Sequence, residues 1–381
     1  MDFSLSAEQR ELMEAATAFA RRELNEDLAK REDAGEFSRD AWQACARFGI
    51  QGLPVPAELG GAGSDVLTTT MIMEALGYGC QDNGLIFSLN AQMWSVELPL
   101  VTFGTPAQQR AYLPGLVSGD IIGGHAMTEP ESGSDALRMR ARAQRQGDQY
   151  LLNGTKQYVT NAPVADVLLV YAAVQGSPGL AGLSAFLVDA ATPGLEVSSA
   201  FEKMGLRTSP MGEVALTDCL IPAGNRLGPE GAGMAVFNSS MEWERSCLFA
   251  STVGAMQRQL DACVEYARSR EQFGQPIGKF QSVAGMLADM YVRLEAARLL
   301  IYRVAWLKQQ GRSAPAEAAA AKVFTSEAWV RSSQDAIQTH GAWGYLKDAG
   351  IERDLRDAVA GTIYSGTSEI QRVILARMLG L

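Results

Sequence analysis

One stretch near the end of the chain limits the possible folds more than any other. Between residues 283 and 304, apolar residues recur at alternating intervals of four and three: Val283, Leu287, Met290, Leu294, Ala297, Ile301 and Val304. This spacing places one apolar stripe along a helix of about six turns, and such a stripe is stable when other helices cover it. The sequence therefore predicts that this helix belongs to a four-helix bundle.

Helical patterns occur at both ends of the chain. The first 120 or so residues begin with a capping-box pattern at Ser6 and Gln9. After residue 233 the helical patterns return, with an alanine-rich helix expected near residues 317–324. The last helix is expected to begin at Ser368, with Gln371 as its capping-box partner.

The middle of the chain, from about residue 121 to residue 229, has short β-type runs instead. The runs 149–152 and 156–160 flank Asn153 and Gly154, a dipeptide typical of a type I′ hairpin turn. Further runs cover residues 167–171, 183–188 and 213–220. We therefore expect an α+β fold with an N-terminal helical domain (1–120), a central β-domain (121–230) and a C-terminal four-helix bundle (231–381).

Composition and motif searches exclude several functional classes. The net charge of −10 argues against nucleic acid as a partner. No apolar run approaches the ~18 residues of a membrane helix and the first residues do not resemble a secretory signal, so we expect a cytoplasmic protein with no membrane association. Two histidines and five widely spaced cysteines predict no metal site and buried, reduced thiols. Neither GxGxxG nor a complete P-loop occurs.

Six motifs, in a fixed order along the chain, carry a resemblance. They are AMTEPESGSD (126–135), LNGTKQYVTNA (152–162), KMGLRTS (203–209), RSREQFGQPIGKFQ (268–281), QTHGAWGY (338–345) and IYSGTSEIQR (363–372). With them the chain resembles the acyl-CoA dehydrogenase family of flavoproteins, nearly from end to end. The resemblance implies that the central domain is a β-barrel and that the cofactor is FAD.

The resemblance also implies which residues hold the FAD. An isoalloxazine ring that accepts a hydride needs neutral hydrogen-bond donors around it, and the matching positions are Met127, Thr128, Tyr158 and Thr160, with Ser134 beside the pyrophosphate. A second set matches positions that reach the ADP portion of FAD or an FAD bound mainly by a neighbouring subunit of a homotetramer (a dimer of dimers): Arg270, Gln281, Gln338, Gly341, Thr367 and Glu369.

The general base is the main departure from the family pattern. Most members carry a glutamate in a YEGT motif, but here Ser365 stands at that position. A minority branch, which includes enzymes like isovaleryl-CoA dehydrogenase, carries the base before an arginine on a bundle helix. Glu244 occupies that position, before Arg245, and Glu242 lies about 200° around the same helix, so the two cannot face one flavin. Trp243 and the apolar run 247–250 predict a dry setting that raises the pKa of Glu244.

The resemblance implies FAD-dependent α,β-dehydrogenation of an acyl thioester, carried by CoA or by the phosphopantetheine of a carrier protein. Glu244 takes the α-proton, the Ser365 backbone amide binds the thioester oxygen, and Ser134, Arg245 and Gly366 contact the substrate. An electron-transfer flavoprotein is an expected partner. The alternative is an oxidase or a non-dehydrogenase of the same fold. His125 stands where Tyr or Phe is usual at the substrate edge of the flavin, and this departure concerns the shape of the substrate.

Overall fold

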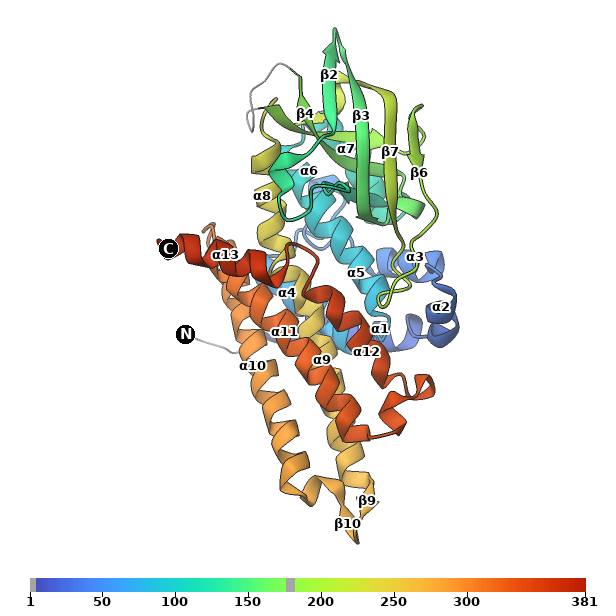
Figure 1. Ribbon diagram of the computed structural model, residues 1–381, viewed down its shortest axis with the longest axis vertical. Coiled ribbons are helices and arrows are strands. Elements are labelled where there is room, and N and C mark those ends of the chain that lie inside the picture. The colour runs from blue at the N-terminus through green and yellow to red at the C-terminus, as the bar shows by residue number, and fades with distance from the viewer. Residues whose placement is uncertain (1–4, 176–181) are drawn as a thin grey trace.

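The structure is a computed structural model that describes residues 5–175 and 182–381. The strands β1 to β8 gather at one end of an elongated molecule, and the long helices α9 to α11 extend toward the other end, where the short strands β9 (Glu271–Gln272) and β10 (Gln275–Pro276) lie (Figure 1). The N-terminal helices are α1 (Ala7–Glu23), α2 (Leu28–Ala34), α3 (Arg39–Phe48), α4 (Val66–Gly79), α5 (Asn83–Gln92), α6 (Leu98–Phe103) and α7 (Pro106–Ser118), with a π-helical turn, Met93–Glu97, between α5 and α6.

The C-terminal helices are α8 (Gly233–Glu244), α9 (Ala250–Ser269), α10 (Gln281–Gln309), α11 (Pro315–His340), α12 (Ile351–Gly361) and α13 (Ser368–Met378). Helices α9 to α12 contribute buried residues to the same apolar core as the N-terminal helices. Helices α4 and α9 meet at two glycines. A Cβ atom would lie 2.0 Å from the Ser251 carbonyl oxygen at Gly77, and 2.0 Å from the Glu74 carbonyl oxygen at Gly254. Only glycine allows this close approach of the two backbones.

The apolar stripe predicted for residues 283–304 lies on α10. Met290, Leu294, Ala297, Ile301 and Val304 are buried, and the two earlier positions of the stripe are partly exposed. Helices α9 and α11 cover this face of α10. The prediction of a packed bundle helix is therefore confirmed.

The middle of the chain forms an eight-stranded sheet. Its strands are β1 (Gly123–Ala126), β2 (Arg142–Gln146), β3 (Gln149–Thr160), β4 (Val167–Val174), β5 (Leu183–Asp189), β6 (Leu195–Val197), β7 (Met211–Pro222) and β8 (Arg226–Leu227). They pair in the order β6-β7-β3-β2-β4-β5-β8, and β1 adds to β4 in parallel. The sheet curls around its own apolar core, and its outer face packs on α6 and α7. No pairing joins β6 to β8 among the described strands, so the expected barrel is open on one side.

The predicted hairpin at Asn153 and Gly154 is wrong. Strand β3 runs through both residues without turning, and the turn lies before it, at Gly147 between β2 and β3. Gly154 instead occupies a bulge opposite β7, with φ of 145°, where a Cβ atom would lie 2.7 Å from Cα of Ala141. The Asn153 amide donates to Asp218 of β7. The same two residue types therefore serve a bulge rather than a turn.

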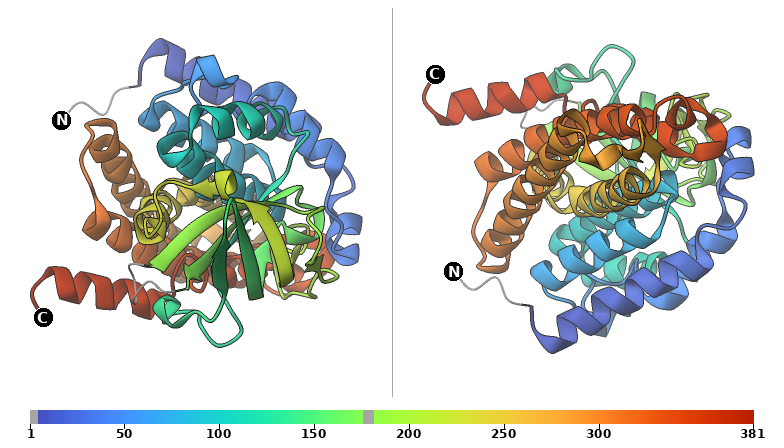
Figure 2. Two further views of the ribbon diagram at one scale, coloured as in Figure 1. Left: turned by 90° about the horizontal axis from the view of Figure 1, so that it is seen from above. Right: turned by 90° about the horizontal axis from the view of Figure 1, so that it is seen from below.

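The N-termini of the first and last helices test two capping predictions. The box at Ser6 and Gln9 is confirmed. The last helix begins at Ser368, but its N-cap is Thr367, whose hydroxyl accepts from the Ile370 amide at 3.3 Å, so the predicted box is wrong. Helix α13 lies against α11, where Arg372 pairs with Glu327, and its C-terminal end extends beyond the other helices (Figure 2).

Candidate active site

The last residue of α8, Glu244, lies where three segments meet. The hydroxyl of Ser95, on the π-helical turn, donates to Oε1 of Glu244, and the hydroxyl of Ser365 donates to Oε2 at 2.6 Å. Both carboxylate oxygens are therefore held by groups that are distant in the sequence. Such a fixed carboxylate has the geometry of a general base whose position is set before substrate arrives.

Neighbouring residues hold the three segments in place. Trp94 and Trp243, which directly precede Ser95 and Glu244, stack with their rings 5.7 Å apart and nearly parallel. Arg245 donates to the Ser365 carbonyl at 3.2 Å. Gln371 also donates to the carbonyls of Ser365 and Gly366, in the loop before α13.

Burial raises the pKa of Glu244 to about 7, against the opposing effects of the Ser365 hydrogen bond and the Arg245 charge. The apolar run 247–250 is buried as predicted, and Trp243 and Glu244 are partly buried. A carboxylate with this pKa is half ionised near neutral pH, and a base works best when its pKa lies close to the working pH.

Glu242 faces the other way, as the helix geometry predicted. It accepts from the Lys308 ammonium at 2.7 Å and from the Ser313 hydroxyl at 2.9 Å, and these contacts lower its pKa although burial opposes them. Glu242 therefore joins α8 to the end of α10 and to the segment that follows it.

The ring-lining motifs meet at one edge of the sheet. The Thr128 carbonyl accepts from the Gln157 amide at 2.8 Å, next to Tyr158. Below this edge the buried Lys156 ammonium donates to the Met127 carbonyl at 3.1 Å and to Glu129 at 2.8 Å. The Lys156–Glu129 pair therefore fixes the backbone of Met127 and Thr128.

This edge fits a flavin. Tyr158 has a φ of 59° and an exposed ring, and Thr128 and Thr160 are partly exposed. Neutral hydroxyl and amide groups thus remain available beside a rigid backbone, as a ring that accepts negative charge requires. Ser134 is exposed on the loop between β1 and β2.

The second predicted set of cofactor residues lies in two separate regions of the structure. Thr367 and Glu369 stand at the start of α13, directly after Gly366 and close to Glu244. The others lie at the end of the bundle that points away from the sheet (Figure 1): Arg270 before β9 (Glu271–Gln272), Gln281 at the start of α10, and Gln338 and Gly341 at the end of α11. These four are exposed. One chain therefore does not bring them to its own flavin edge.

Several residues at the site were missed by the sequence analysis. Ser95 is a buried serine in an apolar helical segment, and no pattern marks it. Glu129 stands in the motif 126–135 and Lys156 in the motif 152–162, and a lysine within a β-type run could have indicated a buried ion pair. Ser365 was assigned only a backbone role, whereas its hydroxyl contacts the carboxylate of Glu244.

Three family models together match most of the chain. They are the N-terminal domain of acyl-CoA dehydrogenase (residues 6–120), its middle domain (124–219) and its C-terminal domain (231–380). The chain belongs to the acyl-CoA dehydrogenase family.

The similar proteins include enzymes named for carrier-bound proline. An L-prolyl-[peptidyl-carrier protein] dehydrogenase from Pseudomonas fluorescens is 45% identical over 92% of this chain and 92% of its own length. The crystal structure of the prolyl acyl carrier protein oxidase AnaB has a TM-score of 0.98 at 49% identity, over 99% of this chain and 100% of that one. The structure of PigA with FAD and proline has a TM-score of 0.97 at 42% identity, over 100% of both chains.

This acyl-CoA dehydrogenase family member is a flavin-dependent oxidoreductase that uses FAD and dehydrogenates acyl thioesters carried by CoA or by a carrier protein. Within the described residues, no helix combines the length and apolar character needed to cross a lipid bilayer.

Proposed function

We propose that this protein dehydrogenates an α-aminoacyl thioester, with prolyl as the acyl group and a phosphopantetheinyl carrier protein as its carrier, and that Glu244 is the general base. The observation that carries the role of Glu244 is the pair of hydroxyls, from Ser95 and Ser365, on its carboxylate. The prolyl group and its carrier are supported by the names of the similar proteins. Where most of the family has a catalytic glutamate, this chain has a serine that binds the replacement glutamate.

The chain's own residues divide the chemistry in this proposal. Glu244, as the carboxylate, removes the proton from the α-carbon, and the Ser365 amide binds the thioester oxygen, on which charge develops. Met127, Thr128, Tyr158, Thr160 and Ser134 hold the cofactor on the sheet side. When bound, FAD accepts the hydride that leaves the β-carbon. Arg245 and Gly366 shape the thioester end of the site.

The test is single-turnover reduction of the enzyme's flavin without oxygen. Glu244→Gln keeps the size and polarity of the side chain but cannot accept the proton, so the rate should fall by roughly 10² to 10⁴ while FAD and thioester still bind. Glu242→Gln is the control on the same helix and should stay within about tenfold of wild type. An unchanged rate in Glu244→Gln would remove Glu244 as the base.

The carrier is tested separately. The same prolyl group is offered on CoA and on a phosphopantetheinylated carrier protein, and kcat/KM is compared. The proposal expects the carrier-bound substrate to be preferred, as the names of the similar proteins suggest. Equal or better use of prolyl-CoA would contradict it.

We also propose a cytoplasmic homotetramer, built as a dimer of dimers, that passes its electrons to an electron-transfer flavoprotein. The exposed positions of Arg270, Gln281, Gln338 and Gly341, away from the sheet, support a site shared between subunits. Sedimentation showing a monomer that holds FAD tightly would contradict the tetramer.

A further inference from the structure

The turn that carries Ser95 is π-helical. It covers Met93–Glu97, between α5 and α6, and the Leu98 amide donates to the Met93 carbonyl, five residues earlier. An α-helix would use the carbonyl four residues earlier, so the turn contains one extra residue. Such single turns are rare, and they are frequent at functional sites.

The extra residue brings two buried polar side chains together across the turn. The Gln92 side-chain amide donates to Oε1 of Glu97 at 2.8 Å. In a regular α-helix, residues five positions apart point about 140° away from each other, so these two side chains would be separated. The contact therefore depends on the π-helical turn. In return it joins the residue before the turn to the last residue of the turn.

Gln92 is also bound to two neighbouring elements. The same amide group donates to the Leu116 carbonyl of α7 at 3.1 Å, and Oε1 of Gln92 accepts from the Gly123 amide at 2.8 Å. Gly123 is the first residue of β1, the strand that leads to Met127 at the flavin edge. Gln92 thus holds the start of the turn against both the helices and the sheet.

Glu97 is a fully buried acid to which the proposed chemistry assigns no part. Its exposed fraction is 0%, and Oε2 has no hydrogen-bond partner among the described residues. Burial raises the pKa of Glu97 to about 8, against the opposing effect of the Gln92 hydrogen bond. Glu97 is therefore mostly uncharged at pH 7, and Oε1 accepts from Gln92 as the carbonyl oxygen of a neutral acid.

The π-helical turn determines the direction of the Ser95 side chain. Trp94 is buried in the core of the helices, whereas Val96 is buried in the core that the sheet shares with α6 and α7. Ser95 lies between these two anchors, and its hydroxyl donates to Oε1 of Glu244. Loss of the extra residue from the turn would rotate the residues on one side of it by about 100° relative to those on the other, and so move the hydroxyl off the carboxylate.

We propose that Gln92 and Glu97 are positioning residues, which close the π-helical turn and thereby hold the Ser95 hydroxyl on the Glu244 carboxylate. The inference rests on the proposed function in that Glu244 is the general base there. A base is effective when its position and its pKa are set before the substrate arrives. Gln92 and Glu97 have no exposed surface, so they act on the reaction through Ser95.

The test measures the pKa of Glu244 in the FAD-loaded enzyme without any substrate. Infrared difference spectra from pH 5.5 to 9.5 follow the bands of protonated carboxyl groups, and the Glu244 band is the one that is absent from Glu244→Gln. This assignment is needed because burial also raises the pKa of Asp357 to about 7 and that of Glu97 to about 8.

Glu97→Met keeps the length of the side chain but removes the oxygen that accepts from Gln92. The Ser95 contact should then weaken, and because this contact favours the carboxylate, the pKa of Glu244 should rise by about 0.5 to 1 unit. Glu97→Gln retains the accepting oxygen and should leave the pKa of Glu244 at the wild-type value. Gln51→Met is the matched control, because Gln51 is equally buried but donates to the Trp42 carbonyl instead. It should also leave the pKa of Glu244 unchanged.

A combined variant distinguishes positioning from general damage to the fold. The pKa of Glu244 in Ser95→Ala is compared with its value in the double variant that also carries Glu97→Met. If Glu97 acts through Ser95, the double variant shows no further rise, because the contact is already lost.

Three outcomes overturn the inference. They are an unchanged pKa of Glu244 in Glu97→Met, a raised pKa in Glu97→Gln, and an equal further rise when the Ser95 hydroxyl is absent. If Glu97→Met does not retain FAD, Glu97→Leu replaces it and is judged in the same way. The proposed function is judged separately, because flavin reduction at the wild-type rate in Glu244→Gln overturns that function while the infrared result still decides whether Glu97 acts on Ser95.

Discussion

A carboxylate that removes a proton near neutral pH needs two opposing influences on its pKa. At Glu244, burial favours the protonated form, whereas the Ser365 hydroxyl and the Arg245 charge favour the carboxylate. Ser95 and Ser365 each hold one oxygen. The balance between these influences sets the pH range in which Glu244 is ionised and could act as the proposed base.

Removing the Ser95 hydroxyl should therefore shift the pH dependence of flavin reduction. Ser95→Ala takes one donor from the charged form only, so the pKa of Glu244 should rise further above 7, by about one unit. The rate at pH 7 should fall several-fold and recover as the pH rises through the new pKa, because only the carboxylate is the base.

Anaerobic rates measured from pH 5.5 to 9.5 check this prediction. Ser365→Ala should shift the profile in the same direction. Ser88→Ala is the control, because it is a buried serine whose hydroxyl bonds Ser209 instead. If the rate of Ser95→Ala is lower by the same factor at every pH, Ser95 has only a structural role.

The sequence indicated Glu244 as the candidate base but did not indicate all of its contacts. Glu244 was predictable because a familiar catalytic position holds Ser365 and a second family position holds a glutamate. The outward direction of Glu242 followed from helix geometry alone. Ser95 carries no comparable signal, since a buried serine in a helix is common, and its role depends on contact with a residue 149 positions away.

At the scale of elements, the helices were predicted better than the turns. The apolar stripe of α10 and the capping box of α1 depend on local spacing, and both are confirmed. Asn153 and Gly154 favour a turn locally, but the pairing of β3 with β7 extends past them, and a bulge absorbs the glycine. Long-range pairing thus overrode a strong local preference.

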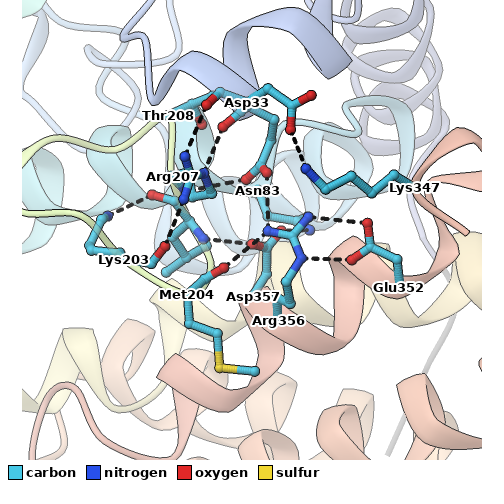
Figure 3. A network of polar contacts seen from close by, with 12 residues as sticks. Asp33, Asn83, Lys203, Met204, Arg207, Thr208, Lys347, Glu352, Arg356 and Asp357 are labelled. Carbon is cyan, nitrogen blue, oxygen red and sulfur yellow. Dashed lines mark hydrogen bonds and ion pairs between the residues drawn. The ribbon is translucent and has the colours of Figure 1, made fainter. Parts of the chain in front are cut away.

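A polar network joins the β-domain to the helices. The loop that follows β6 is held against α12, where Asp357 accepts from the Leu206 amide at 2.6 Å and from Asn83 at 2.9 Å (Figure 3). Arg356 adds bonds to the Met204 carbonyl and to Glu352. Because Asp357 is buried, its pKa is raised to about 7.

Asp357→Ala should destabilise the protein by about 2–4 kcal/mol, because it leaves the Leu206 amide buried without an acceptor and removes one of the two carboxylates that accept from Asn83. Urea unfolding of the flavin-loaded protein, followed by circular dichroism, measures the change. Lys347→Ala breaks the ion pair with Asp33 nearby, but both partners are exposed, so the midpoint should not move measurably. Equal midpoints for Asp357→Ala and wild type would show that the network does not stabilise the fold.

At the scale of the whole molecule, two groups of predicted cofactor residues lie at opposite ends of the chain's fold. Met127, Thr160 and Glu244 lie near the sheet, whereas Arg270 and Gln338 lie at the other end of the bundle (Figure 1). If both groups contact one FAD, two copies of the chain must each contribute one group. Each complete site would then contain Glu244 from one subunit and Arg270 from another.

Subunit mixing tests this arrangement. Arg270→Ala should weaken FAD retention by on the order of 1.5 to 3 kcal/mol through loss of a charge-assisted hydrogen bond, and Glu244→Gln should lose turnover, so each homo-oligomer is impaired. After the two variants are unfolded together and refolded with FAD, mixed dimers should contain one site with Glu244 from the Arg270→Ala chain and Arg270 from the Glu244→Gln chain. That site lacks nothing, so turnover should recover to about a quarter of the wild-type value, since half of random dimers are mixed and each has one intact site of two.

Differently tagged chains, captured together on one resin, establish that mixed oligomers have formed. If such oligomers show no more turnover than the two variants refolded apart, Arg270 acts within its own subunit and the shared site is wrong.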